Sequence, residues 1–392
     1  MRLIHVIHGL EVRGGGSHRA TAELCETLAG LGHDVSLYYV TNRHQEVFAP
    51  KGVDVEGFPS QLLHKFCYSP ALRRRLEAEI PGADLVHIHA LWRYPGIPAA
   101  RIALRHGIPY VVQPHGSLHP WKLAYKGLRK WLYGQLVERR VIRHAAFIHV
   151  ESEADARDVQ TYVPGAKTVL SPCGAAAAAF DDRGPDGYLA RRWPALSGKT
   201  CILYLARIDV NKGIDLLLQA FSRVARNRPD LSLLIAGPDY NRITHKMQAL
   251  ACTLGIADRV VWAGLLSERE RLWVLHQCEF YVLPSLSENF GISVLEAMFC
   301  SKPVITTTAT PWAELEPAGA GLIVPPRADG VARAMQTLLG ESATRRAQRG
   351  ARGRTLAIEQ YEWKSVARKL VRGYEQAIAE KFSAEPIRRR AA

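Results

Sequence analysis

The chain has 392 residues, of which 47% are hydrophobic and 22% are charged, a composition typical of a globular protein without disordered tracts. This length predicts two domains, because a single hydrophobic core rarely organises so many residues. No apolar run approaches the roughly 20 residues that span a bilayer, and the N-terminus lacks the features of a signal peptide. Seven scattered cysteines favour reduced thiols, so we expect a cytoplasmic protein.

The formal net charge of +14 is unevenly distributed along the chain. Between Arg101 and Arg143, nine basic residues face a single acidic residue, Glu138. Such a positive field attracts phosphate groups, which nucleic acids, anionic membranes and lipid diphosphates all carry. The charge alone does not choose among these partners.

The first half of the chain alternates short apolar runs, typical of buried strands, with segments of helical periodicity such as 18–31. A stretch rich in Ala, Gly, Asp and Pro follows, and we expect it to link two domains over 176–198. The first domain is expected over 1–175, with strands at 3–7, 35–39, 85–89, 110–113, 146–150 and 167–170.

The second half repeats this alternation, and strand–helix alternation predicts parallel sheets covered by helices on both faces. Ligands of such sheets bind beyond the carboxyl ends of the strands. The tail over 365–392 has a helical pattern whose periodicity does not decide where it packs, and the first domain is one candidate. The second domain is expected over 199–364, with strands at 201–206, 231–236, 260–263, 280–283, 303–306 and 321–324.

The most specific pattern is the segment 284–298, which follows an expected strand and opens a helix. Glu288 precedes this helix and Glu296 lies about two turns inside it, so the two carboxylates meet different parts of a bound ligand. Two hydroxyl-rich groups joined by a diphosphate fit this spacing. The structural alternative is a capped helix with a solvated glutamate.

The start of this helix is expected to bind an anion. Phe290, Gly291 and Ile292 lie there, and the free backbone N–H groups of a first helical turn favour negative charge, as does the helix dipole.

A second pattern is the basic loop after the strand expected at 201–206, which places Arg207 and Lys212 five residues apart. Arginine binds phosphate bidentately and lysine acts as a compact charge, so this pair suits a diphosphate. A basic loop alone is as compatible with a structural role. Together with the glutamate-containing segment it becomes specific.

These motifs resemble those of the family 4 retaining glycosyltransferases, whose GT-B fold has two Rossmann-like α/β domains with parallel sheets facing across a cleft. The E-x7-E motif of that family is matched by Glu288 and Glu296, and its basic loop by Arg207 and Lys212. Its N-terminal glycine loop is matched by residues 14–16. The resemblance covers nearly the whole chain.

The resemblance implies a role for each matched residue. Arg207 and Lys212 are expected to stabilise the leaving nucleoside diphosphate. Glu288 is expected to bind hydroxyls of the donor sugar, and Glu296 the ribose. The first-domain histidine of the family is matched by His115, which is expected to approach the donor sugar at the reaction centre. The implied catalytic residues are His115, Arg207, Lys212 and Glu288; the implied donor-binding residues are Gly15, Gly16, Arg207, Lys212, Glu288, Asn289, Phe290, Gly291, Ile292 and Glu296.

A metal site is not expected. His87 and His89 alternate along one strand and share a face, which suits a metal pair. No cysteine or carboxylate motif accompanies them, so core or cleft-lining histidines are favoured. The sequence also lacks a D-x-D motif, and we expect neither a metal nor a cofactor besides the nucleotide-sugar substrate.

Residues 121–143 mix aromatic and basic side chains in a helical context. Such a segment suits the surface of an anionic membrane, and family members that use lipid-linked acceptors often carry one. A solvated helix with core aromatics is the alternative, and the pattern does not decide between the two.

We therefore expect a retaining, metal-independent hexosyltransferase at the cytoplasmic face of a membrane. Segments 118–121 and 310–315 resemble a bacterial subgroup that builds exopolysaccharide or lipopolysaccharide, and the second follows a strand, where it could face the donor. GDP-mannose is the first choice of donor and a UDP-sugar the second, with a lipid-linked or saccharide acceptor. The alternatives are an epimerase or phosphorylase of the same fold, an inactive transferase, and a nucleic-acid-binding protein. No nucleic-acid recognition motif is present, so no such partner is expected.

Overall fold

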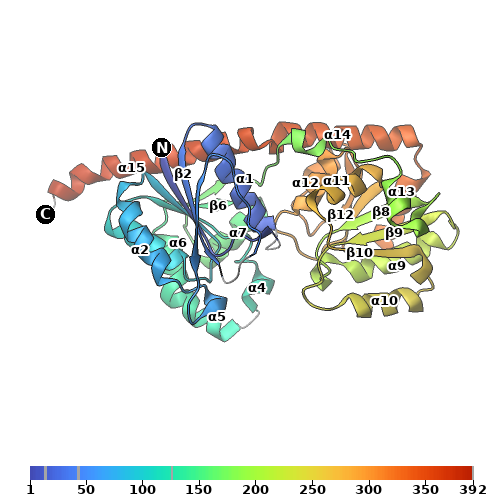
Figure 1. The fold of residues 1–392 in the computed structure, drawn as a ribbon, viewed down its shortest axis with the longest axis horizontal. Coiled ribbons are helices and arrows are strands. Elements are labelled where there is room, and N and C mark those ends of the chain that lie inside the picture. Colours follow the sequence, from blue (N-terminus) through green and yellow to red (C-terminus); the bar gives the residue numbers. More distant parts are fainter. Residues whose placement is uncertain (13–15, 42–44, 125–126, 391–392) are drawn as a thin grey trace. The chain divides into compact units, whose positions relative to one another are not determined.

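The computed structural model describes residues 1–12, 16–41, 45–124 and 127–390 (Figure 1). The chain divides into two compact units, each with its own parallel sheet. Unit 1 comprises residues 1–174 and 363–392, and unit 2 comprises residues 175–362.

Unit 1 is built on a seven-stranded parallel sheet with the order β3-β2-β1-β4-β5-β6-β7. Six of these strands lie within two residues of the predicted bounds. The edge strand β3 was not predicted, because its sequence is largely polar or turn-forming and buries only Phe58. The strands are β1 (Arg2–Ile7), β2 (Asp34–Thr41), β3 (Asp54–Pro59), β4 (Leu85–His89), β5 (Tyr110–Gln113), β6 (Phe147–Val150) and β7 (Thr168–Leu170).

The helices of unit 1 connect these strands and cover the sheet, and the last helix of the chain joins them from the far end of the sequence. Helix α15 packs on α1, so the C-terminal segment completes unit 1. The helices are α1 (Gly16–Gly30), α2 (Pro70–Glu79), α3 (Gly96–Arg105), α4 (Pro120–Ala124), α5 (Gly127–Tyr133), α6 (Arg139–Arg143), α7 (Glu153–Tyr162) and α15 (Trp363–Arg390), with a π-helical turn η4 (Gly134–Glu138).

The two faces of this sheet carry separate cores, because side chains alternate along a strand. Ile4 and Val6 belong to the core on one face, and Leu3 and Ile7 to the core on the other. The second core includes residues of α1 and α15. His5 lies between Leu3 and Ile7 in β1 and therefore points into the core under these two helices.

Unit 2 is built on a six-stranded parallel sheet with the order β10-β9-β8-β11-β12-β13. All six strands were predicted to within one residue at either end. The strands are β8 (Thr200–Leu205), β9 (Leu231–Ala236), β10 (Val260–Gly264), β11 (Phe280–Leu283), β12 (Val304–Thr307) and β13 (Gly321–Val324).

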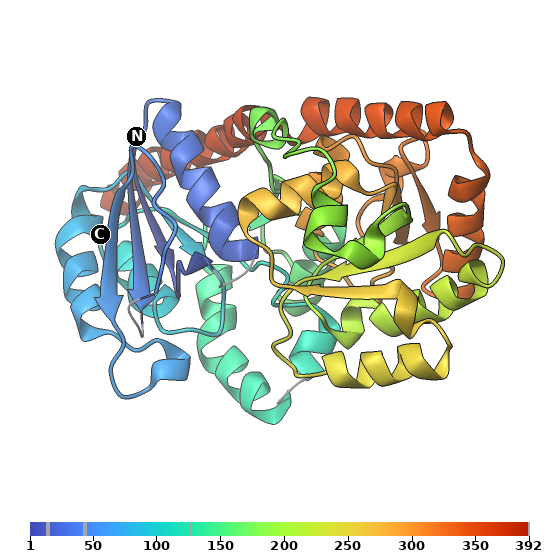
Figure 2. The same cartoon turned by 45° about the vertical axis from the view of Figure 1, so that its right-hand side comes forward.

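The helices of unit 2 form two groups: α9 packs against α10 and α13, and α12 packs against α11 and α14. Figures 1 and 2 show α9 and α10 on one side of the strands and α12 and α14 on the other. The helices are α8 (Tyr188–Arg192), α9 (Ile214–Ala225), α10 (Thr244–Thr253), α11 (Glu268–Gln277), α12 (Ile292–Phe299), α13 (Ala328–Gly340) and α14 (Ala343–Tyr361).

Residues 176–198, expected as a linker, lie in unit 2, where they form two short 3-10 turns and α8. Their apolar side chains hold them there: Phe180 is buried and stacks on Phe299 of α12, with ring centroids 4.9 Å apart, and Leu189 and Leu196 are also buried. Composition alone did not reveal this burial.

Within the part of the chain that the structure describes, no helix combines the length and the apolar character needed to cross a membrane.

Candidate active site

Most of the predicted binding residues of unit 2 lie in the loops that follow β8 and β11, the two central strands of its sheet, and Ile292 and Glu296 lie in α12. The backbone N–H of Leu286 in the second loop donates to the carbonyl oxygen of Asn211 in the first, at 2.7 Å. Gly213 ends the first loop with a φ of +65°, and a Cβ there would clash with the carbonyl oxygen of Pro284. The two loops therefore form one surface at the carboxyl edge of the sheet.

Lys212 and Glu288 meet directly on this surface. The Lys212 ammonium group forms an ion pair with Oε2 of Glu288. Only 13% of the lysine side chain and 11% of the glutamate side chain are exposed. Ser285 donates a hydrogen bond of 3.5 Å to the same carboxylate oxygen. The ammonium group is thus largely buried and already paired with a carboxylate.

Arg207 is held more loosely. Half of its side chain (51%) is exposed, and its guanidinium lies 3.9 Å from Asp209, which itself caps the short turn η7 (Val210–Lys212) through the backbone N–H of Asn211. The hydroxyl of Tyr204 donates to the Arg207 carbonyl oxygen at 2.8 Å and so fixes the backbone. The arginine head is consequently available to a ligand at little cost to the fold.

The start of α12 is shaped by Gly291 and Trp312. Gly291 precedes the helix with a φ of +85°, and a Cβ there would lie 3.1 Å from Cγ of Glu288 and 3.2 Å from Nε1 of Trp312. Trp312 is fully buried and its indole N–H donates to the Phe290 carbonyl oxygen. The Phe290 ring is also buried, against Trp312 and Tyr361.

The Phe290 ring belongs to the core, so only the backbone of this residue can face a ligand. Trp312 lies in the segment 310–315, which the sequence placed where it could face the donor. Its side chain is fully buried and its indole N–H holds the turn before α12. Asn289 is half-buried within that turn, and Ile292 is the first residue of the helix.

Glu296 lies inside α12 with 5% of its side chain exposed, and it forms an ion pair with Arg271 of α11. The structure therefore does not bring Glu296 into the Lys212–Glu288 pair. Sequence reasoning missed Arg271, because only the packing of α11 beside α12 gives that residue its partner.

In unit 1, Gly16 is the exposed first residue of α1, while Gly15 lies outside the described residues. His115 follows β5 with a φ of +51°, a left-handed conformation that side chains rarely adopt. Its Nδ1 lies 3.0 Å from Oε1 of Glu151, and its Nε2 lies 3.4 Å from Nδ1 of His89. Both ring nitrogens of His115 thus have partners within the fold.

Three histidines of β1 and β4, His5, His87 and His89, are buried in unit 1. His5, His87 and His89 are the one group among the described residues whose potential metal-ligand atoms lie within 4.8 Å of one another. Their nitrogens also bond within the protein: Nδ1 of His5 lies 2.9 Å from Nε2 of His89, and Nδ1 of His87 lies 2.7 Å from the Tyr374 hydroxyl. Burial lowers the pKa of all three rings, so they are neutral at neutral pH.

The basic segment 121–143 exposes apolar side chains and buries its single acid. Glu138 is 3% exposed and accepts a hydrogen bond of 2.7 Å from the Trp92 backbone N–H. Burial raises the pKa of Glu138 to about 7, so this residue is not a solvated counter-charge. Among the side chains of this segment that the structure describes, the large exposed apolar ones are Trp121, Leu128, Trp131, Leu132 and Leu136.

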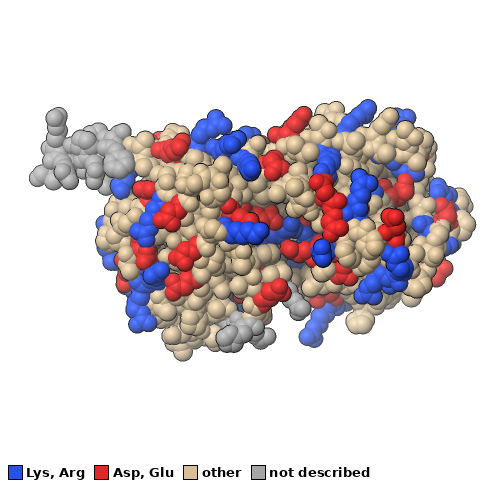
Figure 3. Space-filling model, turned by 45° about the horizontal axis from the view of Figure 1, so that its top comes forward, with Lys and Arg blue, Asp and Glu red and all other residues tan. Residues whose placement is uncertain are grey.

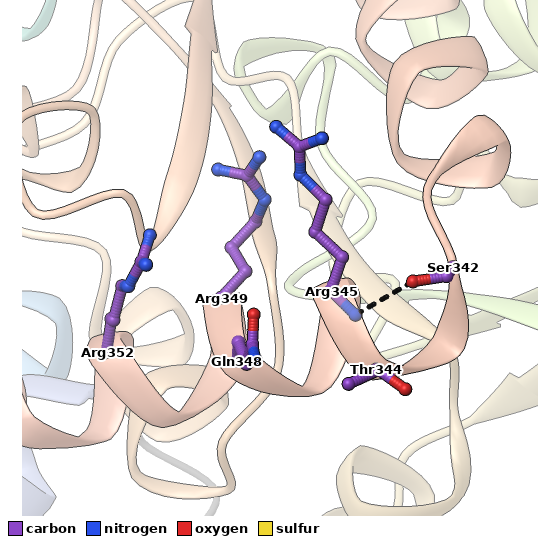
Figure 4. Close-up of a pocket in the computed structure, with 6 residues that line it drawn as sticks. All are labelled: Ser342, Thr344, Arg345, Gln348, Arg349 and Arg352. Carbon is purple, nitrogen blue, oxygen red and sulfur yellow. Dashed lines mark hydrogen bonds between the residues drawn. The ribbon is translucent and has the colours of Figure 1, made fainter.

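Charges of both signs lie interspersed on the face that Figure 3 shows. A basic pocket also lies on α14 (Figure 4), lined by Ser342, Thr344, Arg345, Gln348, Arg349 and Arg352. Ser342 caps the helix and Arg349 forms an ion pair with Glu341, so the pocket is explained by helix capping and packing. None of its residues belongs to the loops after β8 and β11.

The chain is similar in sequence to known glycosyltransferases. A glycosyl transferase 4-like domain matches residues 15–174, and the family described as glycosyl transferases group 1 matches residues 190–355. The GDP-mannose:cellobiosyl-diphosphopolyprenol alpha-mannosyltransferase of Xanthomonas campestris is 27% identical over 79% of this chain and 78% of its own. The alpha-D-kanosaminyltransferase of Streptomyces kanamyceticus is 30% identical over 70% of this chain and 72% of its own.

Among solved structures, HepE of Anabaena in complex with UDP and glucose has a TM-score of 0.77, covers 96% of this chain and 100% of its own, and is 16% identical. Two units with parallel sheets, matched by these domain families, define a glycosyltransferase. The chain belongs to the family 4 glycosyltransferases of the GT-B fold, as its E-x7-E segment and basic loop indicated.

Proposed function

We propose that this glycosyltransferase transfers a hexose from a nucleotide-sugar to a lipid-linked or saccharide acceptor, with retention of anomeric configuration and without a metal ion or other cofactor. One observation carries this proposal. Arg207, Lys212 and the start of α12 lie together at the carboxyl edge of β8 and β11, where a diphosphate would meet two cations and free backbone N–H groups.

Breaking the bond to a nucleoside diphosphate leaves negative charge on the phosphate and positive character on the sugar ring. Arg207, Lys212 and the helix start oppose the negative charge through groups that are already in place. Cations fixed by the protein then do what a divalent metal does elsewhere. Glu288, which neutralises Lys212 in the ligand-free chain, is the residue proposed to bind hydroxyls of the donor sugar.

Glu296 is proposed to bind the ribose, and His115 to lie near the donor sugar at the reaction centre. Both ring nitrogens of His115 are engaged, so a direct exchange of protons with the acceptor would first require those contacts to break. In front-face attack with retention, the departing phosphate helps to deprotonate the acceptor. This mechanism leaves the contacts of the His115 ring intact.

GDP-mannose is the preferred donor and a UDP-sugar the second. The Xanthomonas relative is named for GDP-mannose and for an acceptor on diphosphopolyprenol, while HepE was solved with UDP and glucose. We therefore place the reaction in exopolysaccharide or lipopolysaccharide synthesis, at the cytoplasmic face of a membrane.

Membrane contact is proposed through residues 121–143. Trp131 and Leu136 are 61% and 69% exposed, and the exposed Arg140 and Arg143 lie in the same segment. Apolar side chains beside basic ones suit an anionic leaflet that carries a lipid diphosphate.

The test is a transfer assay in EDTA with GDP-mannose, UDP-glucose and UDP-galactose, each offered with a polyprenyl-diphosphate-linked saccharide. NMR of the anomeric proton of the product reports the stereochemistry. Transfer with retention from one donor supports the proposal. Inversion, a strict need for metal, or conversion of the donor without an acceptor would each contradict part of it; the last is the behaviour of an epimerase.

A further inference from the structure

Four side chains of unit 1 form a continuous chain of contacts at the carboxyl edge of its sheet. Oε1 of Glu151 lies 3.0 Å from Nδ1 of His115, whose Nε2 lies 3.4 Å from Nδ1 of His89. Nε2 of His89 in turn lies 2.9 Å from Nδ1 of His5. Glu151, His89 and His5 are at most 5% exposed, and the His115 side chain is 9% exposed.

The carboxylate sets the direction of its own hydrogen bond with His115. Burial alone would raise the pKa of Glu151, but the hydrogen bond and charge of His115 outweigh burial and hold that pKa at about 2. Glu151 is therefore ionised and only accepts, so Nδ1 of His115 donates. The direction of the next two bonds depends on the His115 ring. A neutral ring accepts at Nε2 from Nδ1 of His89, and Nε2 of His89 then accepts from Nδ1 of His5, whereas a protonated ring would donate at both nitrogens and reverse these two bonds.

The end of the chain agrees with this direction. Nε2 of His5 is buried and has no hydrogen-bond partner. In the direction given above this atom is a lone pair, whereas the reversed chain would leave an unpaired N–H there. A buried N–H without a partner is the rarer and costlier of the two. The hydroxyl oxygen of Thr21 lies 3.2 Å from Nδ1 of His89. In this direction the N–H of His89 forms a bifurcated hydrogen bond, to Nε2 of His115 and to Thr21.

The chain also fixes a strained backbone. His115 has a φ of +51° and Gly116 a φ of +64°, so the turn after β5 is left-handed at two successive positions. For a residue with a side chain this conformation costs about 1–2 kcal/mol. The hydrogen bonds of the ring to Glu151 and His89, together with the backbone hydrogen bond from Ser117 N–H to the Pro114 carbonyl oxygen, offset such a cost.

We infer that Glu151 is a positioning residue for the transfer reaction, which holds the ring and backbone of His115 in place through a directed chain of hydrogen bonds that continues to His89 and His5. This inference rests on the proposed function, which places His115 near the donor sugar. Glu151 itself touches no substrate. The titratable groups that face His115 are His8, His18, His87, His89, His149 and Glu151.

The first measurement needs no variant. In protein labelled with 15N-histidine, the ring nitrogen shifts distinguish the Nδ1–H from the Nε2–H tautomer. We expect His115, His89 and His5 all to be Nδ1–H near neutral pH. An Nε2–H tautomer at His89 or His5 would overturn the directed chain.

The second measurement uses Glu151→Gln, which keeps the size of the side chain but adds donors to it. Gln113 and Cys173 also donate to Oε1 of Glu151, at 3.0 and 3.1 Å, and an uncharged amide oxygen is a weaker acceptor for these donors than a carboxylate oxygen. We expect the His115 tautomer signal to change and kcat to fall about tenfold or more, with the donor KM changed less than about twofold. The pH dependence of kcat should shift as well, which a loss of stability alone would not cause.

Asp155→Asn is the matched control. Asp155 is equally buried, lies one turn further along the chain, and accepts from the Glu151 backbone N–H without contacting a histidine of the chain. We expect it to leave the tautomers and kcat unchanged. A folded Glu151→Gln variant with wild-type tautomers and a kcat within twofold would overturn the inference. Absence of transfer by the wild type from any donor would instead overturn the proposed function.

Discussion

The charged residues of the candidate site differ in how firmly the fold holds them. Lys212 and Glu288 are mostly buried and neutralise each other, so removal of either leaves an uncompensated charge in the protein. Arg207 is half exposed, and its guanidinium lies 3.9 Å from the Asp209 carboxylate. Substitution of Arg207 therefore separates a role in function from a role in folding more cleanly than substitution of the buried pair.

Arg207→Ala is expected to lower kcat about 100-fold or more, because it removes a cation that opposes charge on the leaving diphosphate. The free energy of unfolding should change by less than about 0.5 kcal/mol, as for other exposed side chains. Steady-state kinetics and urea unfolding check the two parts.

Arg327→Ala is the control for that variant, because Arg327 also lies two residues before an aspartate in unit 2, 3.5 Å from Asp329, with 77% of its side chain exposed. It should change neither quantity. Equal kinetics for the two variants would exclude Arg207 from the reaction.

At this scale, spacing along the sequence predicts which residues share a loop, but it does not predict which side chains meet through packing. The loop positions of Arg207, Lys212 and Glu288 follow from their places after two strands. Glu151 and Arg271 gain their partners only from the register of β5 with β6 and from the packing of α11 on α12. No motif in the chain indicates either contact.

Among the elements, the start of α12 depends most on a single residue. Gly291→Ala introduces a Cβ at a φ of +85°, within 3.1 Å of Glu288 and 3.2 Å of Trp312. We expect a loss of about 1–2 kcal/mol in the free energy of unfolding. The KM for the donor should rise as well, since the N–H groups of the helix start move.

Gly340→Ala provides the comparison. Gly340 is the last residue of α13, and a Cβ there would meet nothing within 4 Å. This variant should be as stable as the wild type or up to about 1 kcal/mol more stable. A Gly291→Ala variant with the same stability and donor KM as Gly340→Ala would show that the turn does not require a left-handed residue.

The segment 121–143 gives a prediction for the helices of unit 1. Replacing Trp131 and Leu136 together with Ser should reduce co-sedimentation with vesicles of phosphatidylglycerol about tenfold or more, because it removes two large exposed apolar side chains. Transfer to a short soluble acceptor should be unaffected.

Leu104→Ser is the control for that experiment, since Leu104 of α3 is also exposed, at 44%, but lies outside the segment. Vesicle binding that is unchanged in the double variant, or lost equally in the control, would remove the segment from the membrane-binding surface.

Most elements could be predicted because buried strands are short apolar runs between turn signals. The edge strand β3 gives no such signal, since one of its faces is solvated and it contains Asp, Glu, Gly and Pro. Residues 176–198 looked like a linker for a similar reason: their few apolar residues are isolated, and burial of Phe180 against α12 depends on contacts far along the chain.

For the whole molecule, buried imidazoles predict a steep loss of stability in acid. Burial lowers the pKa of His5 and His8 to about 3 and that of His149 to about 4, and it also lowers the pKa of His87 and His89. The unfolded chain protonates these rings below about pH 6.5, whereas the folded chain keeps them neutral. Their stabilising contribution is therefore fully present above that pH and is lost as the pH falls, by about 1.4 kcal/mol per ring and pH unit.

Two buried carboxyls act in the opposite direction. Burial raises the pKa of Glu138 and Asp155 to about 7, so the folded chain gains stability relative to the unfolded chain as the pH falls from about 7 towards their ordinary values. The five rings outnumber these two groups, and the free energy of unfolding should fall between pH 6.5 and pH 5.

Urea unfolding at several pH values measures this slope, and His149→Gln should reduce it by about one proton. Glutamine can still donate to the Ser171 carbonyl oxygen, which His149 contacts at 2.7 Å, so the variant should remain folded. A free energy of unfolding that is constant from pH 6.5 to pH 5 would contradict the assignment of these rings as buried and neutral.

The central claim is that unit 2 binds a nucleoside diphosphate through fixed cations, and thermal unfolding with GDP, UDP, ADP and dTDP in EDTA tests it most directly. A ligand that binds only the folded chain stabilises it by about 2.7 kcal/mol at 100 times its Kd. We predict a raised Tm with GDP or UDP in the wild type and in Arg327→Ala, and a much smaller rise in Arg207→Ala. No rise with any of the four in the folded wild type, or an equal rise in both variants, would contradict the account.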